Sequence, residues 1–397
     1  MFFNKIGHRL LHSGIVIILA LALATPALAA FTPATYAAAR HVLGQANFTS
    51  HTAAVTQKGM TLPSGVAVDP ITHKVFVADR QNNRVLRYAS LYSLANGAAA
   101  DAVFGQKTFT AHAAATTQHG MRSPYGVFVD KGGRLWVSDT LNHRILRFDH
   151  ASTLASGANA NGVLGQPNFT SSGAHITQKG LDGPLGLFVD GHGRLWVADS
   201  VNSRVLRYNG AASKANGANA DGVLGQADFV TTALGTTQNL FSIPYGVTVD
   251  TGGRLWVADA FNNRVLRFDA AASKANGANA DGVLGQANFT SNAVATTQNG
   301  MSSPYGVATD ASGSLYVADF ANNRILIYSA AAGLANGANA NFVLGQTSFT
   351  SNTANVNGLS AKSLHAPFGL FYDPHAQVLF AADQGNRRVL MYGKPTP

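Results

Sequence analysis

A unit of about 60 residues repeats six times along this chain, and this repeat constrains the fold more than any other feature. The tetrapeptide Val-Leu-Gly-Gln, or a close variant, recurs at spacings of 61, 60, 60, 60 and 60 residues. A length of 397 residues would by itself suggest two or three domains. The repeat instead predicts one architecture built from copies of a single unit. The tetrapeptide ends at Gln45, Gln106, Gln166, Gln226, Gln286 and Gln346.

Each unit carries the markers of four short strands. After the tetrapeptide come Pro-x-Gly, an apolar run that closes on Asp, and Asn-x-Arg followed by Val or Ile. In the fourth unit we predict strands at 246–249, 255–258, 264–268 and 283–286, with a hairpin signal at 250–253. The strands are apolar runs rather than strict alternations, which favours sheets buried on both faces. Four antiparallel strands repeated radially form the blades of a β-propeller.

The two ends of the repeat predict how the ring closes. The tetrapeptide at 42–45 precedes every Pro-x-Gly, so it is a fourth strand without its first three. The last unit, over 369–392, supplies only three strands. We therefore expect the N-terminal strand to complete the last sheet. The predicted fold is all-β: a six-bladed β-propeller of four-stranded antiparallel blades. A solenoid would instead need distinct caps at both ends, and the sequence shows none.

The repeated segments resemble the NHL repeat. Leu-Trp-Val-Ser-Asp at 135–139, followed by Asn-His-Arg-Ile at 142–145, is similar to the signature that names the family. The resemblance covers essentially all of 36–395 and implies a six-bladed propeller. The unit is longer than a typical NHL repeat, because each copy carries two insertions. NHL propellers include protein-binding, RNA-binding and lyase members, so the resemblance implies no single function. The repeat cores lie at about 60–90, 121–150, 181–210, 241–270, 301–330 and 364–394.

The first 29 residues have the three-part pattern of a secretory signal peptide. Lys5 and Arg9 give a positive start, 15–24 is an apolar run, and Ala-Leu-Ala at 27–29 is a small-residue cleavage site. The apolar run is short for a membrane span. We expect this segment, 1–29, to be cleaved off. The mature protein is then expected to be a secreted bacterial protein that lies outside the cell or in the cell envelope. Retention as an uncleaved anchor is the alternative.

Composition excludes several kinds of chemistry. The chain has no Cys, which excludes disulfides, thiolate zinc sites and a cysteine nucleophile. All 19 acidic residues are Asp, so a catalytic Glu pair of the glycosidase type is excluded, as is a Glu metal ligand. The formal net charge is +9, which is compatible with a polyanion ligand or with a framework that uses Arg.

Most of the charged residues belong to the repeat itself. Twelve Asp residues occupy two framework positions, one after the first strand and one after the second strand of each unit. The Arg of Asn-x-Arg follows the second of these shortly afterwards, so we predict a structural Asp–Arg pair in a tight loop. A ring of phosphate-binding arginines is the alternative. The six arginines are Arg84, Arg144, Arg204, Arg264, Arg324 and Arg388.

Two histidines invite a metal hypothesis. His119 precedes a first strand and His143 lies between a second and a third strand, so both should project on one face of the propeller. The resemblance implies this site, because lyases of this propeller family bind zinc through His on such a face. The sequence offers no third His at a matching position of a neighbouring blade. We therefore expect surface histidines here, no cofactor, and no resident metal.

Function is expected where the repeat varies, because a ligand without sixfold symmetry must be recognised by residues that differ between blades. Two varied positions belong to one face: the residue inside Pro-x-Gly and the residue after the second-strand Asp. Both should surround the mouth of the central channel, where aromatic side chains are typical of binding sites. Plain packing of a channel plug is the alternative. The candidate ligand-binding residues are Tyr125, Tyr245, Tyr305, Phe368, Arg80 and Phe320.

These observations predict a monomeric, non-enzymatic binding propeller that recognises a protein or a glycan at the channel mouth. A metal-assisted lyase of the propeller class is the first alternative, and a module that binds nucleic acid or another polyanion such as a cell-wall polymer is the second. No stretch interleaves basic residues with aromatics as an RNA-binding surface would, so we do not expect nucleic acid as the partner.

Overall fold

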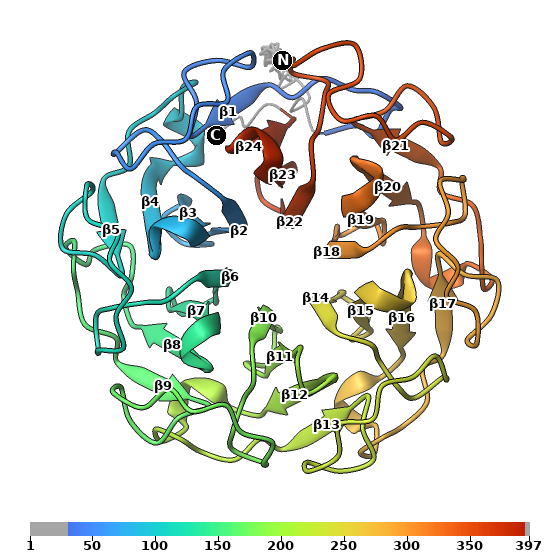
Figure 1. Cartoon of the computed structure of the whole chain (residues 1–397), viewed down its shortest axis with the longest axis horizontal. Helices are drawn as coiled ribbons and strands as arrows, with labels where there is room; N and C mark the ends of the chain where they lie inside the picture. The colour runs from blue at the N-terminus through green and yellow to red at the C-terminus, as the bar shows by residue number, and fades with distance from the viewer. Residues whose placement is uncertain (1–30, 394–397) are drawn as a thin grey trace, which may run out of the picture.

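The computed structural model describes residues 31–393, which form six four-stranded antiparallel sheets arranged around a central axis (Figure 1). This is the six-bladed β-propeller that the repeat predicts. Its first blade consists of β2 (Pro63–Val68), β3 (Lys74–Asp79), β4 (Arg84–Ser90) and β5 (Ala102–Phe104). The second consists of β6 (Pro124–Val129), β7 (Leu135–Asp139), β8 (Arg144–Phe148) and β9 (Gly162–Leu164).

The remaining blades repeat this order from the axis outward. The third has β10 (Pro184–Val189), β11 (Leu195–Asp199), β12 (Arg204–Tyr208) and β13 (Gly222–Leu224). The fourth has β14 (Pro244–Val249), β15 (Leu255–Asp259), β16 (Arg264–Phe268) and β17 (Gly282–Leu284). The fifth has β18 (Pro304–Thr309), β19 (Leu315–Asp319), β20 (Arg324–Tyr328) and β21 (Phe342–Leu344). The sixth has β22 (Pro367–Asp373), β23 (Val378–Asp383), β24 (Arg388–Tyr392) and β1 (His41–Leu43).

The strands predicted for the fourth unit are found with small shifts at their ends. The innermost strand begins two residues earlier, at Pro244, and the outermost ends at Leu284 instead of Gln286. The outermost strand is shorter because Gly285 has a positive φ of 88°, which turns the chain out of the sheet. The Gln286 side chain then donates to the carbonyl of Asn263, 3.0 Å away, and so ties the strand end to the loop before β16.

Short 3-10 turns follow many of the strands. Five of them join the second and third strands of a blade: η1 (Arg80–Asn82), η3 (Thr140–Asn142), η5 (Ala260–Asn262), η7 (Phe320–Asn322) and η9 (Gln384–Asn386). The other four follow third strands, at the opposite end of the blades: η2 (Leu91–Ser93), η4 (Ala211–Ser213), η6 (Ala271–Ser273) and η8 (Ala331–Gly333). Within the described residues, no helix is long and apolar enough to cross a membrane.

The ring closes through the N-terminal strand, as predicted. β1 pairs with β24 in antiparallel register, with His41 opposite Met391 and Leu43 opposite Val389. Val42 and Leu43 are completely buried, so the closing strand belongs to the core. Figure 1 shows β1 beside β24 at the point where the two ends of the chain meet. The predicted signal peptide at 1–29 lies outside the described residues.

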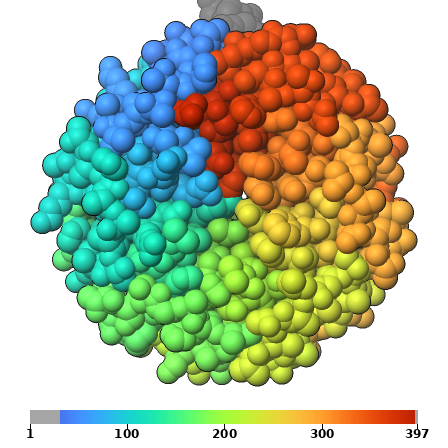
Figure 2. All heavy atoms as spheres, in the orientation of Figure 1, coloured from blue at the N-terminus to red at the C-terminus, as the bar shows by residue number. Residues whose placement is uncertain are grey.

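The glycine of Pro-x-Gly lets the innermost strands approach one another. A Cβ atom placed on Gly246 would lie 2.3 Å from the carbonyl oxygen of Tyr305 in the next blade. The corresponding distances at the other five glycines are 2.0–2.6 Å, too short for any side chain. Glycine is therefore required wherever six blades meet at this radius. Figure 2 shows the blades packed side by side around a small central depression.

The predicted Asp–Arg pairs hold every blade together. In each blade the Arg Nε lies 2.7–2.9 Å from the Asp Oδ2, and both side chains are fully buried. The guanidinium also donates to backbone carbonyls of the long insertions; Arg264, for example, reaches Thr237 and Leu240 at 2.9 and 3.0 Å and also donates to the carbonyl of Phe289. The six arginines are thus structural and have no free surface for a polyanion.

Candidate ligand-binding face

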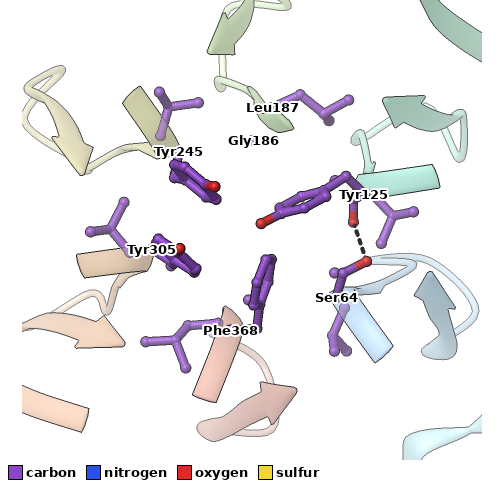
Figure 3. Close-up of a pocket in the computed structure, with 17 residues that line it drawn as sticks. Ser64, Tyr125, Gly186, Leu187, Tyr245, Tyr305 and Phe368 are labelled. Atoms are coloured by element: carbon purple, nitrogen blue, oxygen red, sulfur yellow. Dashed lines mark hydrogen bonds between the residues drawn. The ribbon is translucent and has the colours of Figure 1, made fainter. Parts of the chain in front are cut away.

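The residue inside Pro-x-Gly points into the channel because the first strand is irregular there. In all six blades the pairing register shifts between the Pro and the residue after the Gly. A bulge of this kind re-aims a side chain. Figure 3 shows the rings of Tyr125, Tyr245, Tyr305 and Phe368 extending from their strands towards the channel axis. We call the end of the propeller that carries these rings the aromatic face.

The structure brings all six candidate residues into one cluster. The rings of Tyr245 and Tyr305 stack at 3.9 Å between centroids, and Phe320 stacks on Tyr305 at 4.2 Å. Phe368 lies 4.6 Å from Tyr125 and 5.0 Å from Tyr305. The guanidinium of Arg80 lies over Tyr125 and Phe368 at 5.6 and 5.7 Å, which is the range of a cation–π contact.

This cluster closes the channel at the aromatic face. Tyr125 and Phe368 are only 8% and 3% exposed, whereas Tyr245, Tyr305, Phe320 and Arg80 are half-buried. A cavity of about 70 Å³ remains among the rings and the glycines below them. The cluster therefore combines two interpretations that the sequence left as alternatives: its inner members pack as a plug, and its outer members face solvent.

One polar atom in the plug has no hydrogen-bond partner among the described residues. It is the hydroxyl of Tyr125, which Figure 3 shows directed towards the axis. Burial, together with the neighbouring phenol of Tyr245, raises the pKa of Tyr125 well above its usual range. Burial and Tyr245 likewise raise the pKa of Tyr305. The phenols are therefore neutral donors at physiological pH and are not general bases.

An arc of exposed apolar side chains lies on the same face. Leu141, Val201 and Phe261 occupy the same turn position in blades two, three and four, directly after the varied residue, and are 46%, 57% and 53% exposed. The long insertions around the rim, which join a fourth strand to the next first strand, add further exposed apolar side chains. These are Val230, Leu234 and Val294. Of the seven large apolar residues exposed in the described part of the chain, only Ile71 lies at the opposite end.

His119 is half-buried in the insertion before β6, whereas His143 contacts the next blade. His143 Nδ1 lies 3.1 Å from Asp182 Oδ1 and 3.1 Å from the backbone nitrogen of Gly183 in the next blade. In blades one, four and five an Asn side chain holds the next blade at this position, as when Asn83 Oδ1 accepts from the nitrogen of Ser123 at 2.7 Å. His143 therefore makes the blade-to-blade hydrogen bond that the Asn side chain makes in those blades. Within residues 31–393 no group of three His or Asp side chains is arranged to hold a metal ion.

Sequence reasoning missed a cavity at the other end of the channel. It measures about 320 Å³ and opens on the face that bears the hairpins between first and second strands. Its walls come from the residue two positions after the Gly of Pro-x-Gly and from the residue that follows. The first of these positions reads Ala67, Phe128, Phe188, Thr248, Ala308 and Phe371. The combination of large rings in blades two, three and six with smaller side chains in the other three blades was visible in the sequence and could have indicated the cavity.

Comparisons with known proteins agree with this architecture. The model of the NHL repeat matches residues 241–268 and 301–328, which span the three inner strands of blades four and five. The mouse protein named NHL repeat-containing protein 3 is 27% identical over 220 residues, and its human namesake is 26% identical over 161 residues. Blades four and five therefore carry NHL repeats, and the chain is similar to NHL repeat-containing proteins.

These NHL relatives share only part of their length with this chain. The alignment covers 51% of this chain and 51% of the mouse protein, and 37% of this chain and 39% of the human protein. Among solved structures, a protein of unknown function from Bacteroides thetaiotaomicron matches 88% of this NHL propeller and 74% of its own chain. That match has a TM-score of 0.54 at 14% identity, so the likeness concerns the fold alone.

Proposed function

We propose that this NHL propeller is a secreted, non-enzymatic binding module that holds a protein ligand against its aromatic face. The observation that carries the proposal is that the half-buried rings of Tyr245, Tyr305 and Phe320 and the exposed arc of Leu141, Val201 and Phe261 lie at the same end of the propeller. Exposed apolar surface of this kind marks interaction sites in soluble proteins.

The chemistry of this face favours a protein over the alternatives. The exposed groups are aliphatic and aromatic, and they lie in consecutive blades, as suits an extended apolar segment of a partner. The guanidinium of Arg80 lies over the rings and adds one charged contact beside them. Aromatic and Arg side chains are the residue types that dominate protein interfaces. A glycan is a separate outcome of the test below.

The first prediction concerns the loss of peptide binding when the arc is made polar. The wild-type propeller is used to select peptides from a random library displayed on phage, and the selected peptides should be rich in apolar residues. The triple change Leu141→Ser, Val201→Ser and Phe261→Ser should weaken their binding by about tenfold or more, because hot-spot truncations cost about 2 kcal/mol. Changing the half-buried pair Tyr245→Ala and Tyr305→Ala should have a similar effect. Fluorescence anisotropy with labelled peptides measures both.

The control is Ile71→Ser, which removes an equally exposed apolar side chain from the opposite end of the propeller and should leave affinity unchanged. Melting temperatures of all variants should match the wild type within a few degrees. The proposal fails if peptides keep their affinity for both aromatic-face variants. If binding is instead lost on changing Arg134, Arg194 and Arg254 in the hairpins, the functional face is the opposite one. A glycan array carried out in parallel shows whether carbohydrate replaces protein as ligand.

A further inference from the structure

The cavity at the hairpin end of the channel is a blind pocket. Its floor is the layer formed by the residue after the Gly of Pro-x-Gly in all six blades, and this layer also borders the small cavity beneath the aromatic plug. The pocket therefore ends below the plug and opens only on the hairpin side. Its volume of about 320 Å³ lies at the lower end of the range for small-molecule sites, roughly 300–1,000 Å³. The floor residues are Val66, Val127, Leu187, Val247, Val307 and Leu370.

The pocket has an aromatic wall and a gap. Phe128 lies 4.6 Å from Phe188 and 6.3 Å from Phe371 between ring centroids, so these three rings form one continuous surface. Blades four and five carry Thr248 and Ala308 at the same register, and both line the pocket. These two adjacent blades lack the large ring that three others supply, and blade one carries a small residue, Ala67, which does not line the pocket. If all six blades carried the same residue at this position, the channel would be either filled by six rings or open around its whole circumference.

The charge around the mouth is also asymmetric. In blades two, three and four the Asp that ends the first strand pairs with the hairpin Arg; Asp190 and Arg194, for example, lie 2.7 Å apart. In blades five and six, among the described residues, Asp310 and Asp373 have no such partner. Asp310 accepts from the hydroxyl of Tyr316 at 2.8 Å, and Asp373 accepts from the backbone nitrogen of Ala376 at 2.6 Å. Both line the pocket beside its gap.

The negative charges of these two carboxylates affect the ionisation of the Tyr372 phenol. Burial, followed by the charges of Asp310 and Asp373, raises the pKa of the Tyr372 phenol to about 12. The other charged groups at the mouth are Asp190, which Arg194 neutralises, and Lys131, whose ammonium donates to the carbonyl of Gly191 at 2.9 Å. His375 completes the rim. The side formed by blades five and six is therefore negative, whereas on the side formed by blades two to four the Asp–Arg pairs cancel and Lys131 adds one positive charge.

We propose that this pocket binds a small amphipathic cation, with an apolar body in the channel and an ammonium group at the mouth beside Asp310 and Asp373. The valine and leucine floor removes the apolar body from water. The faces of Phe128 and Phe371 and the two carboxylates attract the positive group, since aromatic faces and unpaired carboxylates both favour a weakly hydrated cation. This site is separate from the aromatic face and does not depend on the function proposed for it.

The test uses three probes of equal chain length: octyltrimethylammonium, neutral 1-octanol and anionic octanoate. Isothermal titration calorimetry on the full-length protein should give one saturable site for octyltrimethylammonium. Octanol should bind about tenfold more weakly, and octanoate more weakly still, because the carboxylates at the mouth favour a cation and repel an anion. Equal affinity for octanoate and the cation, or no binding of any probe by the folded wild type, would overturn the proposal.

Two variants locate the site. Ala308→Phe installs the ring that blades two, three and six already carry at this register, so it should fill the gap without breaking the blade, and it should abolish binding of all three probes. Thr248→Phe does the same from the neighbouring blade and serves if the first variant is unstable. Retained binding in a folded filled variant contradicts the proposed location. The aromatic-face triple change at Leu141, Val201 and Phe261 should leave the titration unchanged, so the two proposals fail separately.

A third variant tests the charge. Asp310→Asn should lower the affinity for octyltrimethylammonium towards that for octanol while leaving octanol binding intact, and the preference that remains is due to Asp373 and the aromatic faces. The matched control is Asp69→Asn, because Asp69 holds the same repeat position in blade one and caps its own turn as Asp310 does, but does not line the pocket. If Asp69→Asn lowers the cation preference as much as Asp310→Asn does, general surface charge and not this site is responsible.

Discussion

A chain that begins at Thr49 should not form a stable monomeric propeller. The truncation removes β1, and with it the completely buried side chains of Val42 and Leu43 and the whole backbone ladder to β24. Burial of each of these side chains stabilises the fold by about 1.5–3 kcal/mol, which together is a large part of the net stability of an ordinary domain. The exposed edge of β24 would also offer unpaired backbone groups to other molecules.

Size-exclusion chromatography and thermal melting followed by circular dichroism measure this outcome. The Thr49 truncation should elute as aggregate or melt without a cooperative transition, whereas a chain that begins at Phe31 should behave as the wild type because it also keeps the buried Phe31 ring beside Tyr316 and Tyr392. The control keeps the backbone bonds of Ala39 to Ala361 and of Arg40 to Met391, and it therefore keeps β1 in register. A monomeric Thr49 chain with a full cooperative melt would show that the ring does not need this strand.

The fold was predictable because six copies of one unit repeat the same information. A single Gly-Val-Thr-Val run is ambiguous, but six runs at constant spacing, each followed by Asp and by Asn-x-Arg, fix strand number, order and pairing. The Asp–Arg pair was predictable for the same reason: at this separation, in a tight loop, the two charges must meet. Ring closure followed from the unpaired strand at 42–45, and β1 beside β24 confirms it.

The candidate site was predictable in place but not in form. Variation inside Pro-x-Gly located the residues of the aromatic cluster, yet the register shift that turns Tyr125 inward depends on backbone geometry that no residue pattern states. The depth of burial likewise depends on how closely six glycines let the blades approach. His143 could not be assigned because its partner, Asp182, belongs to the next blade and stands outside the repeat. Its pairing became visible only when the two blades were side by side.

Loss of the buried guanidinium in one blade should be the most destabilising single side-chain truncation. Arg264→Ala leaves the fully buried carboxylate of Asp259 with only Asn262 and the backbone nitrogen of Ser242 as donors, at 2.8 and 2.7 Å. It also leaves the carbonyls of Thr237 and Leu240 in the adjoining insertion without the hydrogen-bond donor that the guanidinium supplies. Removing one partner of a buried ion pair costs about 3–5 kcal/mol, because the other charge remains buried without compensation. Chemical denaturation followed by tryptophan fluorescence gives the change in unfolding free energy.

The comparison with Arg254→Ala in the same blade decides whether burial is the cause. Arg254 pairs with Asp250 at 3.5 Å and its side chain is 36% exposed, so its removal should cost less than about 1 kcal/mol. A third variant, Asp259→Asn with Arg264→Met, removes both charges and should lose less stability than the single Arg264→Ala change, since no charge is then left unpaired. Equal costs for Arg254→Ala and Arg264→Ala would mean that the buried pair does not hold the blade.

The insertion over 229–241, which Arg264 anchors through Thr237 and Leu240, should also become sensitive to proteolysis in the Arg264→Ala variant. The strands of the other blades should remain protected, because Asp259 and the insertions on either side of its own blade accept the hydrogen bonds of Arg264.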